Sequence, residues 1–420
     1  MKRVMKFGGA LMDSASGIER VVNLIKENSG EPLVVVVSAL GKTTNKLEKL
    51  HQLSVEGNDI NLEFREIKEY HLGIAQDIMP QLPDETSSSL NVLFNELWDA
   101  LNTHYVDRYE AYDSIVSFGE DLSSSLLYHY LRYHDIKVKL ISAKNLIVTD
   151  SNFTDAAIDW NHTSKTINSR IVPALENNEI VLTQGFIGAD KTGKTTTLGR
   201  EGSDFTAAIL GNLLDADEVT IWKNVPGLMN SDPARFTNSV KLDSLSYHEA
   251  IELAYYGASV IHPKTIQPLK QKNIPLYVRP YYDSSLDATS ITNDITKDGE
   301  LPSIIIKDNQ VLLSINTLNL SFIGEENLKH IFDAFSKNKI HINLMQNSAV
   351  SFSVCFNEDV VKLEALLFDL KKEFLLKYNT GLQLITIRHY NDDLVDKLTR
   401  NKKVYLVQKS RITVQLLVKT

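Results

Sequence analysis

The chain has 420 residues, of which 43% are hydrophobic and 23% charged, and its formal net charge is −9 at pH 7. This composition is typical of a folded globular protein, and the length fits two or three domains. The negative charge argues against a general binder of nucleic acids or membrane surfaces, and the single cysteine, Cys355, excludes an internal disulfide and favours a reduced, cytoplasmic protein.

The first segment predicts a β-α-β unit and then a long helical insert. A short strand at residues 4–7 leads into Gly8-Gly9 and an amphipathic helix, and residues 33–37 form a continuous β-branched run. Such a run is typical of a parallel strand that is buried on both faces. Residues 58–132 then follow a helical pattern with no convincing strand, so we expect a helical insert. No apolar stretch approaches the roughly 20 residues that a membrane helix needs.

Strands and helices alternate after the insert, which indicates an α/β domain. Further strands are predicted at residues 138–141, 180–183, 219–222 and 275–278. Further helices are predicted at residues 160–176, 203–214 and 247–256. A polar stretch with glycine and proline, residues 293–302, is a candidate linker. We therefore place a first α/β domain at residues 1–300, with a parallel-rich sheet between helices.

The pattern changes after residue 310. Strands are predicted at residues 311–315, 340–344, 350–356 and 382–388, and helices at residues 327–335 and 360–374. The resulting order βαββαβ is that of a ferredoxin-like unit. A hairpin of residues 404–407 and 412–418 follows it. We therefore place a second domain at residues 301–420.

The motif Lys6-Phe7-Gly8-Gly9 lies where the first strand ends. Glycines let backbone N–H groups approach a phosphate, and the helix that follows offers its positive N-terminus. A lysine beside them can neutralise charge on a transferred phosphoryl group. A turn that simply requires glycine explains the motif about equally well.

Residues 188–195 match the pattern GxxxxGK[ST] of a phosphate-binding P-loop. A true P-loop follows a buried strand and opens an apolar helix. Residues 195–199 (TTTLG) are instead β-prone and have no helical stripe. We therefore predict two strands joined by a polar tip at residues 189–193, and not a P-loop.

The densest motif is residues 196–204 (TTLGREGSD). Ser203 can cap a helix that begins at Asp204, and Arg200 can clamp a carboxylate through two hydrogen bonds. A capped helix with a glycine-rich entry is an equally good explanation. Glu120 similarly stands in the first turn of a predicted helix, where compensation of the helix dipole alone would explain it.

Residues 222–227 (WKNVPG) leave a predicted strand, at the place where α/β folds bind ligands. A Pro-Gly turn would also explain them. The histidines are scattered and lack the close pairs that a zinc site requires, so we predict no metal ligand on the protein.

Taken together and in this order, the motifs of residues 1–300 resemble those of the aspartate kinases of the amino-acid kinase superfamily. The segments that carry the resemblance are KFGG at 6–9, VVVVSALGKTTN at 34–45, SFGEDLSSSLL at 117–127, GF at 185–186, TTTLGREGSDFTAA at 195–208 and YYGASVIHPKTI at 255–266. The βαββαβ region resembles the ACT regulatory domain of that family. Because few residues follow residue 388, we expect a second ACT unit to be truncated, and no fused homoserine dehydrogenase.

The resemblance implies transfer of a phosphoryl group from ATP, with Mg²⁺, to the β-carboxylate of L-aspartate. The product would be 4-phospho-L-aspartate, the first intermediate of lysine, threonine and methionine biosynthesis. No general base is needed, because a carboxylate with a pKa of about 3.9 is already ionised at neutral pH. Positioning and charge stabilisation would supply the catalysis.

The resemblance also assigns roles to residues. Arg200 would bind the α-carboxylate of aspartate, and Glu120 its ammonium. The other residues of that pocket would be Ser38, Thr44, Phe186 and Ser203. Lys6 would stabilise charge in the transition state, and Asp204 would organise Lys6 or the metal-bound phosphates. The residues that would border the nucleotide are Lys6, Phe7, Gly8, Gly9, Lys223, Asn224, Met229, Ser259 and Val260.

Some positions depart from the family pattern, chiefly on the nucleotide side. Lys223-Asn224 stand where the family usually has Thr-Asp. Ser259 stands where it has a lysine, although Lys264 follows a turn later.

We expect a homo-oligomer, at least a dimer, that assembles partly through residues 310–420, and a small amino-acid effector, lysine or threonine, near residues 343–348. Two alternatives remain open: a kinase for another small acid, such as glutamate or N-acetylglutamate, and a catalytically weak regulatory protein that binds amino acids. Glu120 favours a substrate with a free ammonium group, whereas the altered loop at residues 223–224 motivates the second alternative.

Overall fold

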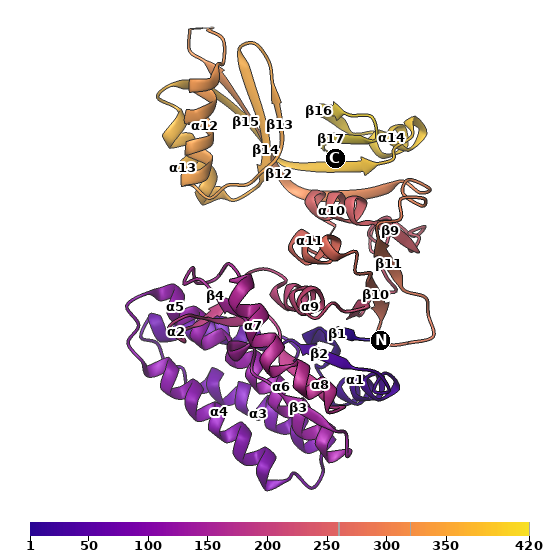
Figure 1. Ribbon diagram of the computed structural model, residues 1–420. Helices are drawn as coiled ribbons and strands as arrows, with labels where there is room; N and C mark the ends of the chain where they lie inside the picture. Colours follow the sequence, from indigo (N-terminus) through magenta and orange to yellow (C-terminus); the bar gives the residue numbers. More distant parts are fainter. Residues whose placement is uncertain (259–260, 320, 420) are drawn as a thin grey trace. The chain divides into compact units, whose positions relative to one another are not determined.

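The computed structural model describes residues 1–258, 261–319 and 321–419 (Figure 1). The chain forms two compact units. The first unit comprises residues 1–228, 241–251 and 259–297, and the second comprises residues 229–240, 252–258 and 298–420. Each unit has its own sheet and is described by itself.

A sheet with the strand order β3-β5-β2-β1-β8-β10-β11-β9 forms the centre of the described part of the first unit. The strands are β1 (Arg3–Phe7), β2 (Leu33–Val37), β3 (Val138–Leu140), β5 (Ile180–Gln184), β8 (Glu218–Lys223), β9 (Ser244–Ser246), β10 (Leu276–Pro280) and β11 (Thr289–Thr292). Neighbours are parallel from β3 to β10, and β10 and β11 are antiparallel. Strand β2 is buried along its whole length, as its β-branched run predicts.

The register brings the carboxyl ends of the central strands to one edge of the sheet. Phe7 of β1 lies level with Val37 of β2 and with Trp222 of β8, and Gln184 of β5 lies level with Val37. The glycine motif, Ser38 and the residues after β5 and β8 therefore meet at this edge, where open α/β sheets bind ligands.

Helices pack on both faces of this sheet. The helices outside the insert are α1 (Ala15–Glu27), α7 (Trp160–Arg170), α8 (Val172–Glu176), α9 (Gly202–Leu213) and α11 (Pro263–Lys272), and residues 247–251 of α10 (Tyr247–Tyr256) also belong to this unit. Met5 and Phe7 join the core formed with α1 and the insert. Because side chains alternate along a strand, Lys6 points to the other face, and α9 contacts β1, β2 and β8.

The predicted helical insert consists of long helices that lie alongside one another (Figure 1). They are α3 (Asn61–Ile78), α4 (Asp84–Asn102), α5 (Arg108–Val116) and α6 (Phe118–Tyr133). The insert also includes α2 (Thr43–Val55), which lies before the predicted bounds of 58–132 and contacts α3 and α5. Buried side chains such as Ile67, Phe94 and Leu97 form its core. Pro80 and Pro83 lie between α3 and α4, where neither breaks a helix.

A small second sheet carries the predicted polar tip. It contains β4 (Val148–Thr149), β6 (Ile187–Asp190) and β7 (Thr195–Thr197), and β6 and β7 are antiparallel. The GxxxxGK segment therefore forms a hairpin and no P-loop, as predicted. Lys194 at its tip lies 2.7 Å from the carboxylate of Glu110 on α5. Short 3₁₀ helices, η1 (Gly9–Leu11) and η2 (Ala143–Asn145), complete the first unit.

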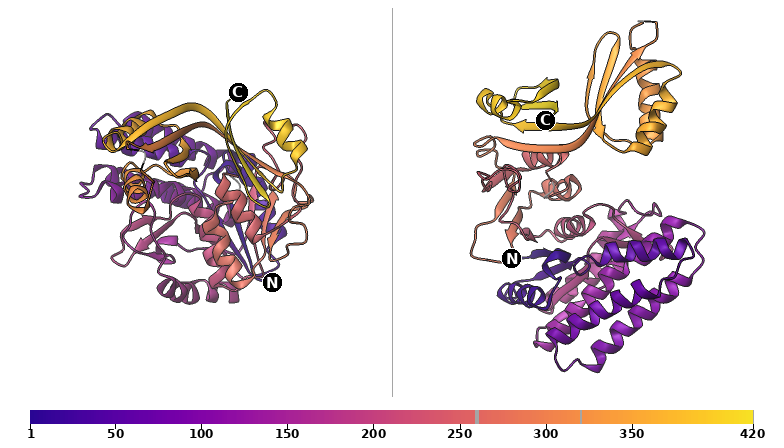
Figure 2. Two further views of the ribbon diagram at one scale, coloured as in Figure 1. Left: turned by 90° about the horizontal axis from the view of Figure 1, so that it is seen from above. Right: turned by 180° about the vertical axis from the view of Figure 1, so that it is seen from behind.

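The second unit is built on an antiparallel sheet with the strand order β13-β14-β12-β15-β17-β16. The strands are β12 (Ser303–Thr317), β13 (Ile342–Asn347), β14 (Ser351–Asn357), β15 (Phe374–Arg388), β16 (Lys403–Lys409) and β17 (Thr413–Lys419). The helices are α12 (Glu325–Lys337), α13 (Val360–Leu370) and α14 (Asp392–Thr399). Figure 2 shows α12 and α13 side by side on one face of the sheet.

The predicted boundaries around residue 374 were wrong. Helix α13 ends at Leu370, and Phe374 begins a strand of 15 residues. The pairing of β12 with β15 shifts register between residues 307 and 312, opposite Gly381, which has φ 63°. This bulge divides both strands into halves.

The two halves of β12 and β15 pair with different strands of the sheet. Residues 310–317 and 374–379 complete a βαββαβ unit with β13, β14, α12 and α13. Residues 303–307 and 384–388 instead join β17 and β16, and α14 precedes β16. The strand at residues 382–388, predicted as the last strand of the βαββαβ unit, thus belongs to the half of the sheet that contains β16 and β17. Strand β17 lies between β15 and β16 and is not an edge strand.

Candidate active site

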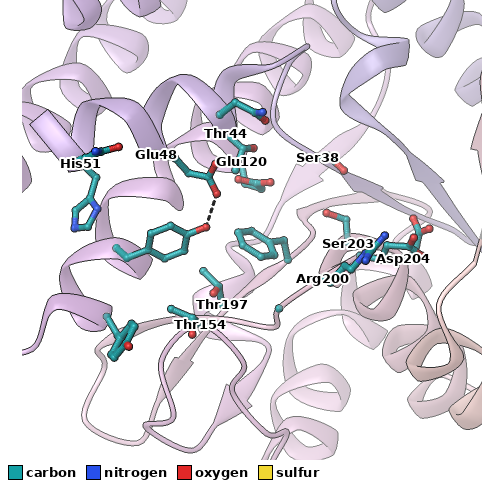
Figure 3. Close-up of a pocket in the computed structure, with 18 of the residues that line it drawn as sticks. Ser38, Thr44, Glu48, His51, Glu120, Thr154, Thr197, Arg200, Ser203 and Asp204 are labelled. Atoms are coloured by element: carbon teal, nitrogen blue, oxygen red, sulfur yellow. Dashed lines mark hydrogen bonds between the residues drawn. The ribbon is translucent and has the colours of Figure 1, made fainter. Parts of the chain in front are cut away.

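A cavity of about 1000 Å³ opens at the carboxyl ends of the central strands of the first unit (Figure 3). Its lining includes nine residues that the sequence predicted for catalysis, substrate binding or nucleotide binding: Lys6, Ser38, Thr44, Glu120, Phe186, Arg200, Ser203, Asp204 and Lys223. These residues come from segments that are far apart in the sequence. The fold therefore brings most of the predicted site together.

A buried carboxylate at one end of the cavity lies between two lysines. Asp204, on the first turn of α9, is only 2% exposed. One of its oxygens lies 2.7 Å from Nζ of Lys6, and the other lies 3.1 Å from Nζ of Lys223. Burial alone would raise the pKa of Asp204, but the charges and hydrogen bonds of the two lysines outweigh it and hold the pKa below its usual value. This end of the cavity thus combines two cations with one anion.

Glu120 presents a second buried carboxylate, which forms no ion pair with the residues that the structure describes. It is 3% exposed, and its Oε1 accepts a hydrogen bond of 3.3 Å from the backbone N–H of Ala39. Its Oε2 has no hydrogen-bond partner in the described part of the chain. Burial raises the pKa of Glu120 to about 8. A buried acid with an unused oxygen is costly, and a ligand that brings a positive donor would relieve that cost.

The glycine before Glu120, Gly119, allows the close backbone approach that places Glu120 beside Ala39. A Cβ on Gly119 would lie 2.8 Å from the Cβ of Ala39. Only glycine therefore lets the first turn of α6 approach the loop after β2. Gly9 has the same function beside that loop, since a Cβ there would lie 2.1 Å from the carbonyl oxygen of Ala39.

The segment that carries Arg200 turns sharply before α9. Gly199 and Glu201 both have positive φ angles, 75° and 55°. Arg200 between them is exposed at the cavity, and its guanidinium makes no ion pair with the residues that the structure describes. A cation without a partner that faces the cavity can bind an anionic group of a ligand.

Ser203 does not cap α9, which corrects the prediction. The helix begins at Gly202, so Ser203 lies within its first turn, and the N-cap position is Glu201 without a side-chain cap. The helix can start earlier because Gly202 packs closely on Phe186, where a Cβ would lie 2.7 Å from a ring carbon. Ser203 nevertheless lines the cavity.

The remaining predicted nucleotide residues do not all face the cavity. Phe7 is fully buried and stacks on Trp222, with ring centroids 6.0 Å apart, so it belongs to the core. Asn224 is exposed after β8. Met229 belongs to the second unit, and Ser259 and Val260 lie outside the described residues. Lys264 forms an ion pair with Asp155.

The helical insert contributes a wall of the cavity that sequence reasoning missed. The additional lining residues from α2 and α5 include Glu48, His51, Gln52, Val55, Tyr109 and Tyr112. The hydroxyl of Tyr112 donates a 2.6 Å hydrogen bond to Glu48 (Figure 3). Helical periodicity predicts which face of these helices is apolar. It does not predict that the polar residues on another face border a cavity.

The sheet, its strand-end cavity and the paired lysines are features of a phosphotransferase, and the chain belongs to the amino acid kinase family, whose model matches residues 1–280. It is 32% identical over 423 residues to Aspartokinase 2, chloroplastic, of Arabidopsis thaliana, a match that covers 97% of this chain and 73% of that protein. It is 33% identical over 361 residues to Aspartokinase 1, chloroplastic, of the same plant, covering 84% of this chain and 62% of the relative.

Solved structures place it in the same group. Escherichia coli aspartokinase III in complex with aspartate and ADP (R-state) is 25% identical, with a TM-score of 0.84 over 100% of this chain and 96% of that one. The complex of that enzyme with lysine and aspartate (T-state) is 25% identical, with a TM-score of 0.82 over 99% and 96%. Within its family the chain thus groups with the aspartokinases. The predicted family and fold class are confirmed.

The described residues contain neither a membrane-spanning helix nor a cluster of metal ligands. No helix among them is long and apolar enough to cross a membrane. No group of three or more His, Cys, Asp or Glu side chains among them could hold a metal ion.

Proposed function

We propose that this chain transfers the γ-phosphoryl group of ATP to the β-carboxylate of L-aspartate, giving 4-phospho-L-aspartate and ADP. One observation carries the proposal: a single cavity presents the acid Glu120, the guanidinium of Arg200 and the pair of lysines on Asp204, and neither Glu120 nor Arg200 forms an ion pair within the described part of the chain. A free amino acid has the complementary groups. The likeness to an enzyme that is solved with aspartate and ADP agrees with it.

Aspartate would be oriented by its two α-substituents. Arg200 would bind the α-carboxylate through paired hydrogen bonds, and Glu120 would accept the ammonium. Ser38, Thr44 and Ser203 would supply hydroxyl groups around the same ligand, and the ring of Phe186 would pack against its carbon chain. With both α-groups held, the β-carboxylate is directed to the lysine end of the cavity.

The lysine end would stabilise the charge that moves during transfer. The β-carboxylate attacks the γ-phosphorus as an anion, the bond to the β,γ-bridging oxygen breaks, and ADP leaves with that oxygen. Lys6 and Lys223 are held by the same buried carboxylate and would act as two fixed cations beside the transferred group. Asp204 would keep them in place without itself taking a proton.

Mg²⁺ would enter as part of the substrate MgATP. This ion typically uses one or two carboxylates together with substrate phosphates. Asp204 is the carboxylate at this end of the cavity, and both of its oxygens already pair with lysines. We therefore propose that the phosphates hold the metal and that the protein adds few direct ligands.

The nucleotide phosphates would lie against the glycine motif. Gly8 and Gly9 follow β1 directly, and Gly8 lies beside Lys6, since a Cβ on Gly8 would be 3.4 Å from Nζ of that lysine. Asn224, Met229, Ser259 and Val260 stay proposed neighbours of the nucleotide, and Phe7 would act from the core by supporting the strand.

Regulation and assembly would involve the second unit. Its sheet ends in two edge strands, β13 and β16, and unpaired edges favour pairing with another chain. We propose a homo-oligomer that forms through this unit. An amino-acid effector is proposed on the likeness to the E. coli enzyme, which is solved with lysine.

A panel of acids tests the proposed substrate. The purified chain would be incubated with MgATP and either aspartate, glutamate or N-acetylglutamate, and the acyl phosphate would be trapped as a hydroxamate. We expect product with aspartate and about 100-fold less or none with the others, because a site built for one chain length misplaces the longer acids. Equal or greater product with glutamate would contradict the proposal. ATP binding without any product would favour the regulatory alternative.

A further inference from the structure

Asp113 is a buried acid beside the cavity that the proposed reaction does not use. It lies on α5 and is fully buried. Its carboxylate accepts hydrogen bonds from the backbone N–H of Thr154 (2.9 Å), the backbone N–H of Thr197 (2.8 Å) and the hydroxyl of Thr197 (2.7 Å). All three donors come from two residues that line the cavity.

Thr154 is held in a conformation that it would not adopt freely. Its φ angle is 72°, and a β-branched residue at positive φ is a genuine outlier. Such a conformation persists where surrounding contacts impose it, and it is common at ligand sites. The hydrogen bond from Thr154 to Asp113 is one such contact. Another is the 2.9 Å bond from the backbone N–H of Ala156 to the carbonyl of Thr197, which ties the same loop to β7.

These contacts adjoin the segment that carries Arg200. Thr197 is the last residue of β7, and the chain then turns through Gly199 and Glu201 into α9. A Cβ on Gly199 would lie 2.7 Å from the carboxylate of Asp155, so the turn rests on the loop that contains Thr154. A shift of that loop would therefore move the guanidinium of Arg200.

We propose that Asp113 is a positioning residue for substrate binding: it fixes Thr154 and Thr197, and through them the turn that presents Arg200. This inference rests on the proposed function, because it takes Arg200 to bind the α-carboxylate of aspartate. It adds a residue outside the cavity to the residues of the helical insert that serve substrate binding, since α5 carries Asp113 and packs against β7.

An acid at position 113 is better suited to hold Thr154 and Thr197 by hydrogen bonds than to fill space in the core. Burial raises the pKa of Asp113, and the hydrogen bonds from Thr154 and Thr197 oppose that shift. A well-packed apolar side chain would avoid burying an acid at all. An aspartate, however, offers two oxygens that together accept all three donors, which an apolar residue leaves unpaired.

The test compares variants of the full chain by steady-state kinetics with aspartate and with ATP. Asp113→Ala removes all three bonds and should raise KM for aspartate about 10- to 100-fold, because small displacements of a binding group have effects of that size. KM for ATP and kcat should change by about twofold or less. Asp113→Asn should recover most of the affinity, since its carbonyl can accept both N–H groups while the hydroxyl of Thr197 turns to accept from its amide.

The chain offers a matched control. Glu110 is on the same helix, and its ion pair with Lys194 reaches the same hairpin, but neither residue lines the cavity. Glu110→Ala should therefore leave KM for aspartate within about twofold of wild type. If Asp113→Ala does not fold, Thr197→Val keeps the backbone N–H and the shape, removes one hydrogen bond and should still raise KM for aspartate severalfold.

The outcomes separate this inference from the proposed function. If wild type makes acyl phosphate from aspartate and the folded Asp113→Ala variant keeps its KM for aspartate, the positioning role is wrong and the function stands. Equal losses in Asp113→Ala and Asp113→Asn, or in Asp113→Ala and Glu110→Ala, would also overturn it. If wild type does not act on aspartate, the proposed function fails, and the inference that rests on it fails too.

Discussion

Aspartate binding should release a proton from Glu120 at neutral pH. In the free protein burial raises the pKa of this carboxyl to about 8, so at pH 7 it is mostly protonated. The proposed contact with an ammonium requires the ionised form and lowers the pKa in the complex. Binding at pH 7 should therefore release about 0.9 proton per site, because a group with a pKa of 8 is about 90% protonated there.

The same linkage sets the pH dependence of affinity. The apparent dissociation constant rises as the free carboxyl becomes protonated, so it should be about 25-fold larger at pH 6.5 than at pH 8.5. Calorimetric titration of aspartate at pH 7, in two buffers that differ in ionisation enthalpy, measures the released proton directly. Glu120→Gln should bind aspartate far more weakly and show neither effect, whereas the affinity for ATP should stay constant over this range.

The free energy of unfolding of the ligand-free protein should fall as pH rises, whereas the affinity for aspartate increases. The folded-state pKa of Glu120 lies above the unfolded value of 4.5, so the free energy of unfolding falls as pH rises from 4.5 to 8. Glu120→Gln removes this loss and should stabilise the ligand-free protein at pH 8 by a few kcal/mol. Aspartate binding that releases no proton, together with a variant that is less stable than wild type at pH 8, would show that the pKa of Glu120 is not raised in the ligand-free protein.

Further predictions concern the other charges and the assembly. Arg200→Lys should raise KM for aspartate roughly 30-fold or more in steady-state assays, since lysine cannot offer a planar fork; an unchanged KM would exclude the clamp. Lys6→Ala should reduce kcat by at least about 100-fold with ATP still bound, and Lys223→Met should reduce it less but measurably; wild-type kcat in either variant would remove that lysine from the transition state. Lys194→Ala should stay within about threefold of wild-type kcat, because its ion pair with Glu110 is exposed; a loss like that of Lys6→Ala would place the phosphate at the hairpin. Sedimentation velocity of the full chain should show a dimer or larger, and a monomer at micromolar concentration would contradict assembly through residues 310–420.

Much of the first unit could be predicted from local patterns. Burial can be predicted from the local pattern alone for the β-branched run at residues 33–37 and for the helical stretch of the insert, because the pattern does not depend on the packing partner. The glycines beside Lys6 and Glu120 were also informative, because close backbone approaches at Gly9 and Gly119 admit no other residue. Glycine motifs of this kind indicate the strand-end site from the amino-acid sequence alone.

What the sequence did not predict depends on contacts between distant segments. Asp113 has no motif of its own, and its role depends on Thr154 and Thr197, which join it only in the folded chain. The link between Lys223 and Asp204 is likewise set by the position of β8 beside β1. In the second unit, only residues 382–388 were predicted as a strand, whereas the strand runs from Phe374 to Arg388 across the bulge opposite Gly381.

The position of the new bond shows which carboxylate of aspartate accepts the phosphoryl group. The purified chain would be incubated with MgATP, aspartate and hydroxylamine, and mass spectrometry would locate the hydroxamate on the α- or the β-carboxylate. We predict β-aspartyl hydroxamate, one per ADP formed, because Glu120 and Arg200 hold the α-groups away from the lysines. Hydroxamate on the α-carboxylate, or ADP formed at the same rate without aspartate, would contradict it.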